Sequence, residues 1–86
     1  MARFKPSRCR SACVANRTTR VIALAGALGW ELDRVRYSTW SVYLTLGRAW
    51  QEVTVRVSNH APRAGFSRQG IDASRIAYSK LRELLE

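Results

Sequence analysis

The sequence predicts an α+β domain of the order α-β-β-β-α, in which a three-stranded antiparallel sheet has two helices on one face. Two observations support this order. Apolar residues recur at helical spacing near both ends of the domain, in residues 18–28 and 72–84. Between them, residues 40–46 and 53–57 alternate between apolar and polar side chains, which is the period of a half-buried strand. A chain of 86 residues has room for one such domain.

The first helix is expected to begin at Thr18 or Thr19, because a threonine hydroxyl accepts a hydrogen bond from the free N–H groups of a first helical turn. Gly29 ends it. A helix of roughly eleven residues is marginal alone in water, so it must pack against another element. Its apolar positions are Val21, Ile22, Leu24, Ala25 and Leu28.

The strands are expected to follow this helix directly. In segment 31–37, the apolar residues change from even to odd positions between Leu32 and Val35, which indicates a bulge in the first strand. Gly47, Arg48 and Ala49 are expected to form a short hairpin loop between the second and third strands. One face of the sheet is expected to bury Val42, Leu44, Val53, Val55 and Val57, and the other to leave Tyr43, Thr45, Thr54 and Arg56 open.

The rest of the chain is predicted to be a loop followed by a helix. Residues 58–70 are rich in Ser, Pro and Gly, which is typical of a loop. The second helix is expected to begin at Asp72 or Ser74. Its apolar stripe consists of Ala73, Ile76, Ala77, Leu81 and Leu84. The three tryptophans are expected in the core or at an interface.

Positive charge is concentrated near the N-terminus. Six of the first twenty residues are Lys or Arg, and no acidic residue precedes Glu31. Residues 1–16 are expected to form a basic, disordered arm, followed by a single domain at 17–86. The chain has a net charge of +9, with thirteen arginines and two lysines. Because arginine binds phosphate bidentately and stacks on bases, nucleic acid is the expected partner, with RNA ranked above DNA.

No cofactor, metal or membrane is expected. Cys9, Cys13 and His60 supply at most three soft ligands, whereas a closed structural zinc site uses four. Free thiols favour a reducing cytoplasm. The chain has no run of eighteen apolar residues. No paired histidines, phosphate-binding glycine loop or activated nucleophile is recognisable, so no catalytic residue is assigned.

The expected function is therefore that of a small, basic, non-catalytic protein that engages nucleic acid or a nucleoprotein complex through arginines. The expected nucleic-acid-binding residues are Arg17, Arg20, Arg34, Arg36, Arg48, Arg56, Arg63, Arg68, Arg75 and Lys80. A protein partner would instead contact Tyr43, Trp50, Arg56 and His60.

With this order of elements, residues 18–85 resemble the double-stranded-RNA-binding fold and, within it, the HicA-type toxin family. The resemblance lies in Gly29-Trp30-Glu31-Leu32-Asp33-Arg34, Ser41-Val42-Tyr43-Leu44 and Val53-Thr54-Val55-Arg56-Val57. It implies RNA contacts at the first helix, the strand loop and the start of the second helix. HicA-type ribonucleases have a histidine in the turn before the second strand, where this chain has Tyr37-Ser38-Thr39-Trp40. A toxin ribonuclease is therefore an alternative that depends on His60.

Residues 41–44 and 55–60 also resemble segments of short proteins from phages and mobile elements. Some of those proteins inhibit host defence, as anti-CRISPR proteins do. The resemblance implies a further alternative, a phage-encoded inhibitor that acts by steric occlusion of an acidic or RNA-containing complex.

Overall fold

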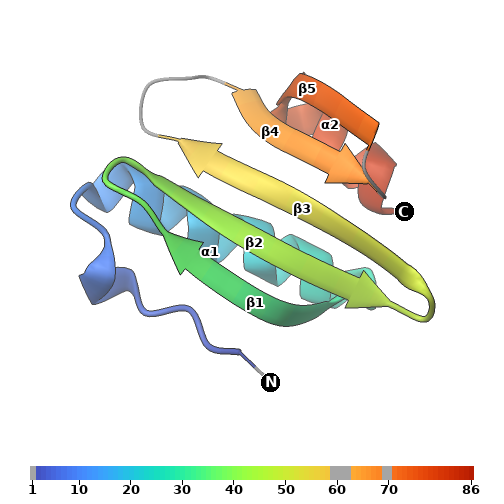
Figure 1. Cartoon of the computed structure of the whole chain (residues 1–86), viewed down its shortest axis with the longest axis horizontal. Helices are drawn as coiled ribbons and strands as arrows, with labels where there is room; N and C mark the ends of the chain where they lie inside the picture. The colour runs from blue at the N-terminus through green and yellow to red at the C-terminus, as the bar shows by residue number, and fades with distance from the viewer. Residues whose placement is uncertain (1, 59–62, 69–70) are drawn as a thin grey trace.

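The computed structural model describes residues 2–58, 63–68 and 71–86. The α+β class is confirmed: an antiparallel β1-β2-β3 core lies between an N-terminal and a C-terminal helix in the chain (Figure 1). Two further strands extend the sheet. The elements, including one 3-10 turn (η1), are η1 Pro6–Arg8, α1 Ala12–Ala27, β1 Glu31–Tyr37, β2 Ser41–Arg48, β3 Gln51–Ser58, β4 Arg63–Arg68, β5 Ile71–Ala77 and α2 Tyr78–Leu85.

Helix α1 begins earlier than the sequence predicts. Its N-cap is Ser11, whose side chain accepts a hydrogen bond from the Val14 N–H at 3.3 Å. The expected caps Thr18 and Thr19 lie inside the helix, and the basic segment before it ends at residue 11 instead of 16. The reason is a continuous apolar stripe, since the buried positions Val14, Ala15, Thr18, Val21 and Ala25 follow the helical period.

The C-terminal end of α1 is as predicted. Leu28 is the C-cap, and Gly29 follows it with a φ of +88°, a left-handed conformation that glycine adopts without steric cost. The chain then enters β1. The register between β1 and β2 shifts between Leu32 and Arg34, which confirms the predicted bulge.

The hairpin between β2 and β3 is tighter than expected. Gly47 and Arg48 belong to β2, and Arg48 pairs with Gln51, so that only Ala49 and Trp50 form the turn. Ala49 has a φ of 54°, in the region that short hairpin turns require. Trp50 therefore lies at the tip of the hairpin, where its side chain is 85% exposed.

The predicted loop and the start of the predicted second helix are both wrong in part. Residues 63–68 form β4, residues 71–77 form β5, and α2 begins only at Tyr78, after the expected starts Asp72 and Ser74. The five strands are antiparallel neighbours in the order β1-β2-β3-β4-β5. Without β4, the second edge of β3 would leave backbone N–H and C=O groups unpaired. Long-range pairing thus overrides a local apolar pattern that also suits a helix.

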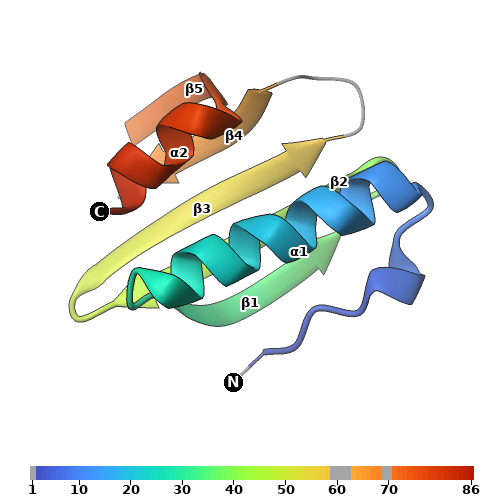
Figure 2. The ribbon, with the colours of Figure 1, turned by 180° about the vertical axis from the view of Figure 1, so that it is seen from behind.

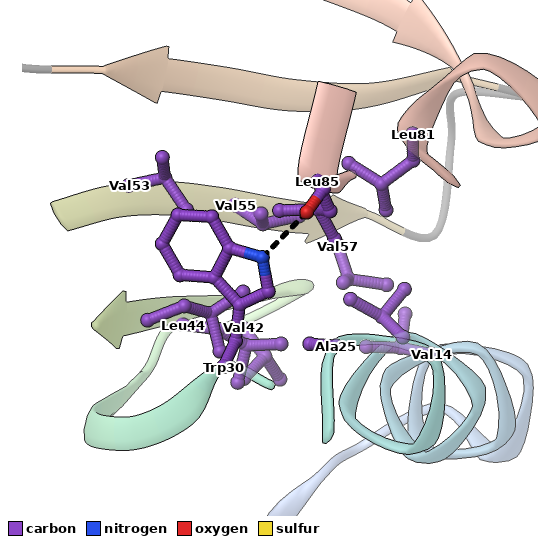
Figure 3. Close-up of a cluster of buried hydrophobic side chains, with 12 residues drawn as sticks. Val14, Ala25, Trp30, Val42, Leu44, Val53, Val55, Val57, Leu81 and Leu85 are labelled. Carbon is purple, nitrogen blue, oxygen red and sulfur yellow. Dashed lines mark hydrogen bonds between the residues drawn. The ribbon is translucent and has the colours of Figure 1, made fainter. Parts of the chain in front are cut away.

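Both helices cover the same face of the sheet, as predicted (Figure 2). The core side chains come from α1, β2, β3 and α2 (Figure 3). The indole N–H of Trp30 donates to the Leu85 carbonyl at 2.7 Å, which joins the start of β1 to the end of α2. The fully or almost fully buried residues include Val14, Val21, Ala25, Val42, Leu44, Leu46, Val53, Val55, Val57, Leu81 and Leu85. Burial of these side chains supplies the main driving force for the fold.

Only one tryptophan is in the core. Trp30 is 4% exposed, whereas Trp40 is 45% exposed although its parity matches that of the buried residues in β2. Trp40 precedes β2 in the turn from β1, so the alternation of the strand does not extend to it. None of the described helices is long and apolar enough to cross a membrane.

Candidate nucleic-acid interface

The face of the sheet opposite the helices presents a row of planar and cationic side chains. Strand register places Arg36, Tyr43, Arg56 and Gly65 side by side across β1, β2, β3 and β4. The guanidinium carbon of Arg36 lies 4.3 Å from the centre of the Tyr43 ring, and that of Arg56 lies 5.8 Å from it. Both arginines are exposed, while Tyr43 is half-buried between them. The ring therefore holds two guanidinium groups by cation–π attraction.

In β2 and β3, threonines border this row on the hairpin side. Next to it, the register aligns Arg34, Thr45 and Thr54, with Ser67 continuing the alignment on β4. At Gly65, an added Cβ would approach the Arg56 Cβ to 3.0 Å, so glycine at this position leaves space for the arginine side chain. The Arg56 Nε also donates to the Ser41 hydroxyl at 3.3 Å. These contacts orient Arg56 along the open face.

Charge is separated along the strands of this face. Toward the β2-β3 hairpin, Glu31 and Glu52 flank Gly47 in register, and the Asp33 carboxylate at the bulge lies over Gly47. These are three of the six acidic residues in the chain. Away from the hairpin, the same face presents Arg34, Arg36 and Arg56. We call these three arginines and Tyr43 the arginine–tyrosine patch.

The basic N-terminal segment lies beside β1, at the edge of the sheet (Figure 1). Phe4 stacks on Tyr37 with ring centres 6.1 Å apart, and the Arg8 guanidinium lies 4.5 Å from the same ring centre. The Lys5 N–H donates to the Tyr37 hydroxyl at 2.7 Å. The only sequence signal for this contact is Phe4, the one aromatic side chain in the segment. Four exposed cations, Arg3, Lys5, Arg8 and Arg10, extend the positive charge beyond the edge of the sheet.

Arg48 lies elsewhere and makes its contacts within the chain. It donates hydrogen bonds to the Leu28 and Leu85 carbonyls, each at 2.9 Å, and its guanidinium lies 4.4 Å from the Trp30 ring centre. It also donates to the Glu86 carbonyl at 3.1 Å. These acceptors lie at the C-terminal ends of α1 and α2, where the helix dipoles favour a cation. Arg48 is therefore a structural link between the two helices.

Arg17 is likewise engaged on the helical side. It donates to the Ser58 carbonyl at 3.3 Å, and its guanidinium lies 5.5 Å from the Tyr78 ring centre. Burial raises the pKa of the Tyr78 hydroxyl above its ordinary value, so this group stays protonated at neutral pH. Arg17 and Tyr78 line a hollow of about 240 Å³ between α1 and α2.

The remaining predicted residues lie outside the parts of β1, β2 and β3 that form the patch. Arg20 and Lys80 are exposed on α1 and α2, which cover the other face. Arg63 and Arg68 belong to β4, and Arg75 lies in β5 instead of at the start of the second helix. His60 lies outside the described residues. Trp50 is exposed in the turn at the hairpin tip, next to the strand ends that carry Glu31 and Glu52.

No catalytic or metal-binding arrangement is found among the described residues. The turn from β1 to β2 is closed by the Ser38 N–H, which donates to the Ser41 carbonyl at 2.8 Å, and it contains no histidine. Burial raises the pKa of the Cys9 thiol, which lowers its thiolate fraction. In the part of the chain that is described, no group of three His, Cys, Asp or Glu side chains is arranged so that it could hold a metal ion.

Comparison with known proteins places the chain in no established group: no protein family, curated protein or solved structure matches it.

Proposed function

We propose that this chain is a small non-catalytic nucleic-acid-binding protein and that the arginine–tyrosine patch is its binding surface. RNA ranks above DNA as the proposed ligand. The observation that supports this most directly is the Arg36–Tyr43–Arg56 row on a sheet face that neither of the two described helices covers. Two guanidinium groups beside an aromatic ring offer hydrogen-bond donors to phosphate and planar surfaces to bases.

The distribution of charge supports the same surface. The acidic residues of the open face are gathered at the hairpin end, so the three arginines of the patch act together. The N-terminal segment adds four exposed cations beside β1. A polyanion that lies across the patch and along this segment meets seven cations. Arg17 and Arg48, which are engaged within the fold, are not required.

The test is the salt dependence of binding, measured by fluorescence anisotropy with a labelled RNA oligonucleotide. With about six of the seven cations on phosphates, the slope of log affinity against log salt is expected to be about −4 to −6. Replacing Arg34, Arg36 and Arg56 together by Gln should reduce its size by about 2. A control with Arg20, Lys80 and Arg82 replaced by Gln removes the same charge from the helical side and should leave the slope nearly unchanged. Equal effects of the two triple variants would contradict the assignment of the patch.

A second candidate is a protein-binding inhibitor, and the observation that favours it is the 85% exposure of Trp50 at the hairpin tip. Large exposed aromatic side chains are frequent anchors of protein interfaces. In this case a protein partner should remain bound after nuclease treatment. Its binding should be lost in Trp50→Ala but retained in Lys80→Gln. A partner that disappears on nuclease treatment would support the nucleic-acid function instead.

Catalysis is tested with the same samples. RNA incubated with the protein is expected to remain intact, because the described residues include no histidine and the carboxylates of the open face lie at its hairpin end, away from the arginine–tyrosine patch. Cleavage that is lost in His60→Ala would establish the ribonuclease alternative.

A further inference from the structure

We propose that the arginine–tyrosine patch selects unpaired strands, because bases stack on the Arg36–Tyr43–Arg56 row. This inference rests on the proposed function and narrows its ligand from nucleic acid in general to single-stranded nucleic acid. It differs from the expectation drawn from the double-stranded-RNA-binding fold, which places contacts across a duplex groove.

The first argument is the chemistry of the row. Arg36 and Arg56 are exposed, and each guanidinium lies near the Tyr43 ring, at 4.3 Å and 5.8 Å from its centre. A guanidinium packed on an aromatic ring keeps its outer face available to a further planar group, and nucleobases stack on arginine and tyrosine alike. Stacking of this kind is tolerant of sequence, since every base has a π-face.

The second argument is the shape of the surroundings. The row crosses β1, β2 and β3 near the β1-β2 turn. In β2 and β3 it is bordered on the hairpin side by Thr45 and Thr54, and in β4 it ends at Gly65, so these neighbours have short side chains or none. Such a face is too broad to enter the deep, narrow major groove of duplex RNA. Against a duplex it meets phosphates and sugars, while the bases remain stacked on one another. The stacking interaction is therefore available only to unpaired bases.

The third argument concerns the path of the strand. Glu31, Asp33 and Glu52 occupy the hairpin end of the same face and repel phosphates. The strand is thus confined to the end of the sheet near the β1-β2 turn, where it crosses β1, β2 and β3. At its β1 side it meets the cations of the N-terminal segment.

The experiment compares three probes at one low salt concentration: an eight-nucleotide oligouridylate, an abasic strand of the same length, and an eight-base-pair RNA duplex. The abasic strand keeps the phosphates and removes the stacking. The wild-type protein is expected to bind the oligouridylate about 5-fold or more tightly than the abasic strand, as one stacked base predicts. The duplex should bind no more tightly than the abasic strand. A deoxyuridine strand in parallel distinguishes RNA from DNA.

The variants separate stacking from charge. Arg36→Lys keeps the charge but removes the planar group, and Tyr43→Leu removes the ring; both should bring the ratio of oligouridylate to abasic affinity close to one. Tyr43→Phe keeps the ring and should preserve the ratio, and Arg20→Lys is the matched control on the helical face.

The outcomes are distinct. Equal wild-type affinities for the oligouridylate and the abasic strand, or tighter binding of the duplex, overturn the single-strand inference and leave the proposed function standing. Absence of binding to every probe at low salt overturns both. Because the main comparison uses the wild-type protein, it does not depend on how well Tyr43→Leu folds.

Discussion

Residues of the same type have different roles in this protein, and Arg48 is the clearest case because its role is structural. Its guanidinium binds carbonyl groups at the C-terminal ends of both helices and stacks on the Trp30 ring. Hydrogen bonds from a charged donor to buried carbonyls contribute more to stability than neutral ones. The same residue type at Arg36, on the open face, is exposed to solvent.

Arg48→Lys is therefore expected to lower the free energy of unfolding by about 2 kcal/mol, because a single ammonium cannot reach all of these acceptors or stack on the indole. The charge is retained, so the salt dependence of RNA binding should not change. Urea denaturation measures the first effect and fluorescence anisotropy the second. Arg82→Lys, at an exposed ion pair with Glu86, is the control and should leave stability unaltered. A salt slope of RNA binding that is smaller in Arg48→Lys than in the wild type would indicate that Arg48 contacts RNA.

Thr18 supports a second prediction at this scale. Its side chain is fully buried in α1, and its hydroxyl has no hydrogen-bond partner among the described residues. Thr18→Val replaces this hydroxyl by a methyl group of similar shape and should raise the free energy of unfolding by about 1 kcal/mol. Thr19→Val is a matched control, because the Thr19 hydroxyl donates to the Ala15 carbonyl at 3.0 Å on an exposed position. Destabilisation by Thr18→Val in urea denaturation would mean that the hydroxyl is satisfied.

At the scale of elements, the boundary between the basic segment and α1 determines how the N-terminus can be shortened. Ser11 caps the helix, and Val14 and Ala15 are buried in the first turns. The segment before Ser11 contacts β1 through Phe4 and Arg8 on Tyr37 and through hydrogen bonds from the Ala2 and Lys5 N–H groups. The charge of this segment and the stability of the helix are thus separable at residue 11.

Removal of residues 1–10 should leave the fold intact and reduce the size of the salt slope by about 3, since four cations are lost. Removal of residues 1–16 should instead lower the free energy of unfolding by about 3 kcal/mol, because it also deletes the helix cap and two core side chains. Far-UV circular dichroism with urea denaturation measures the fold and the free energy of unfolding of both truncated proteins. Fluorescence anisotropy at several salt concentrations measures the salt slope of RNA binding. A fully stable protein lacking residues 1–16 would contradict the early start of α1.

At the scale of the whole molecule, the two helices and the sheet share one core. Leu81 and Leu85 of α2 pack in the same cluster as Val21 and Ala25 of α1 (Figure 3). Trp30 connects the start of β1 to the last carbonyl of α2. No part of this cluster is large enough to form a separate unit.

Unfolding is therefore expected to be a single cooperative transition. In a variant with Trp40→Phe and Trp50→Phe, the fluorescence of Trp30 reports on the core alone. Its urea transition should coincide with that of far-UV circular dichroism, and Leu85→Ala should shift both by about 3 kcal/mol in the free energy of unfolding. Two separate transitions would show that α2 and the sheet unfold independently.

The candidate site could be predicted only in part. The sequence predicts from charge that Arg34, Arg36 and Arg56 bind nucleic acid, whereas it predicts Tyr43 only as a contact to a protein partner. Alternation in β2 and β3 assigns Tyr43 and Arg56 to the open face. Whether these four residues lie together in one patch depends on the register between β1 and β2, including the shift at the bulge. Arg17 and Arg48 were expected on the same grounds, but long-range hydrogen bonds engage them inside the fold. Residue type and charge do not distinguish an arginine on the open face from one that is engaged inside the fold.

The sequence by itself determined the α+β class, the alternation of β2 and β3, the bulge in β1 and the end of α1 at Gly29, because each depends on neighbouring residues and their local preferences. Only the tertiary structure decided the two added strands, the late start of α2 and the role of Arg48. These features arise from contacts between residues far apart in the chain, and the free energy of such contacts outweighs local propensity.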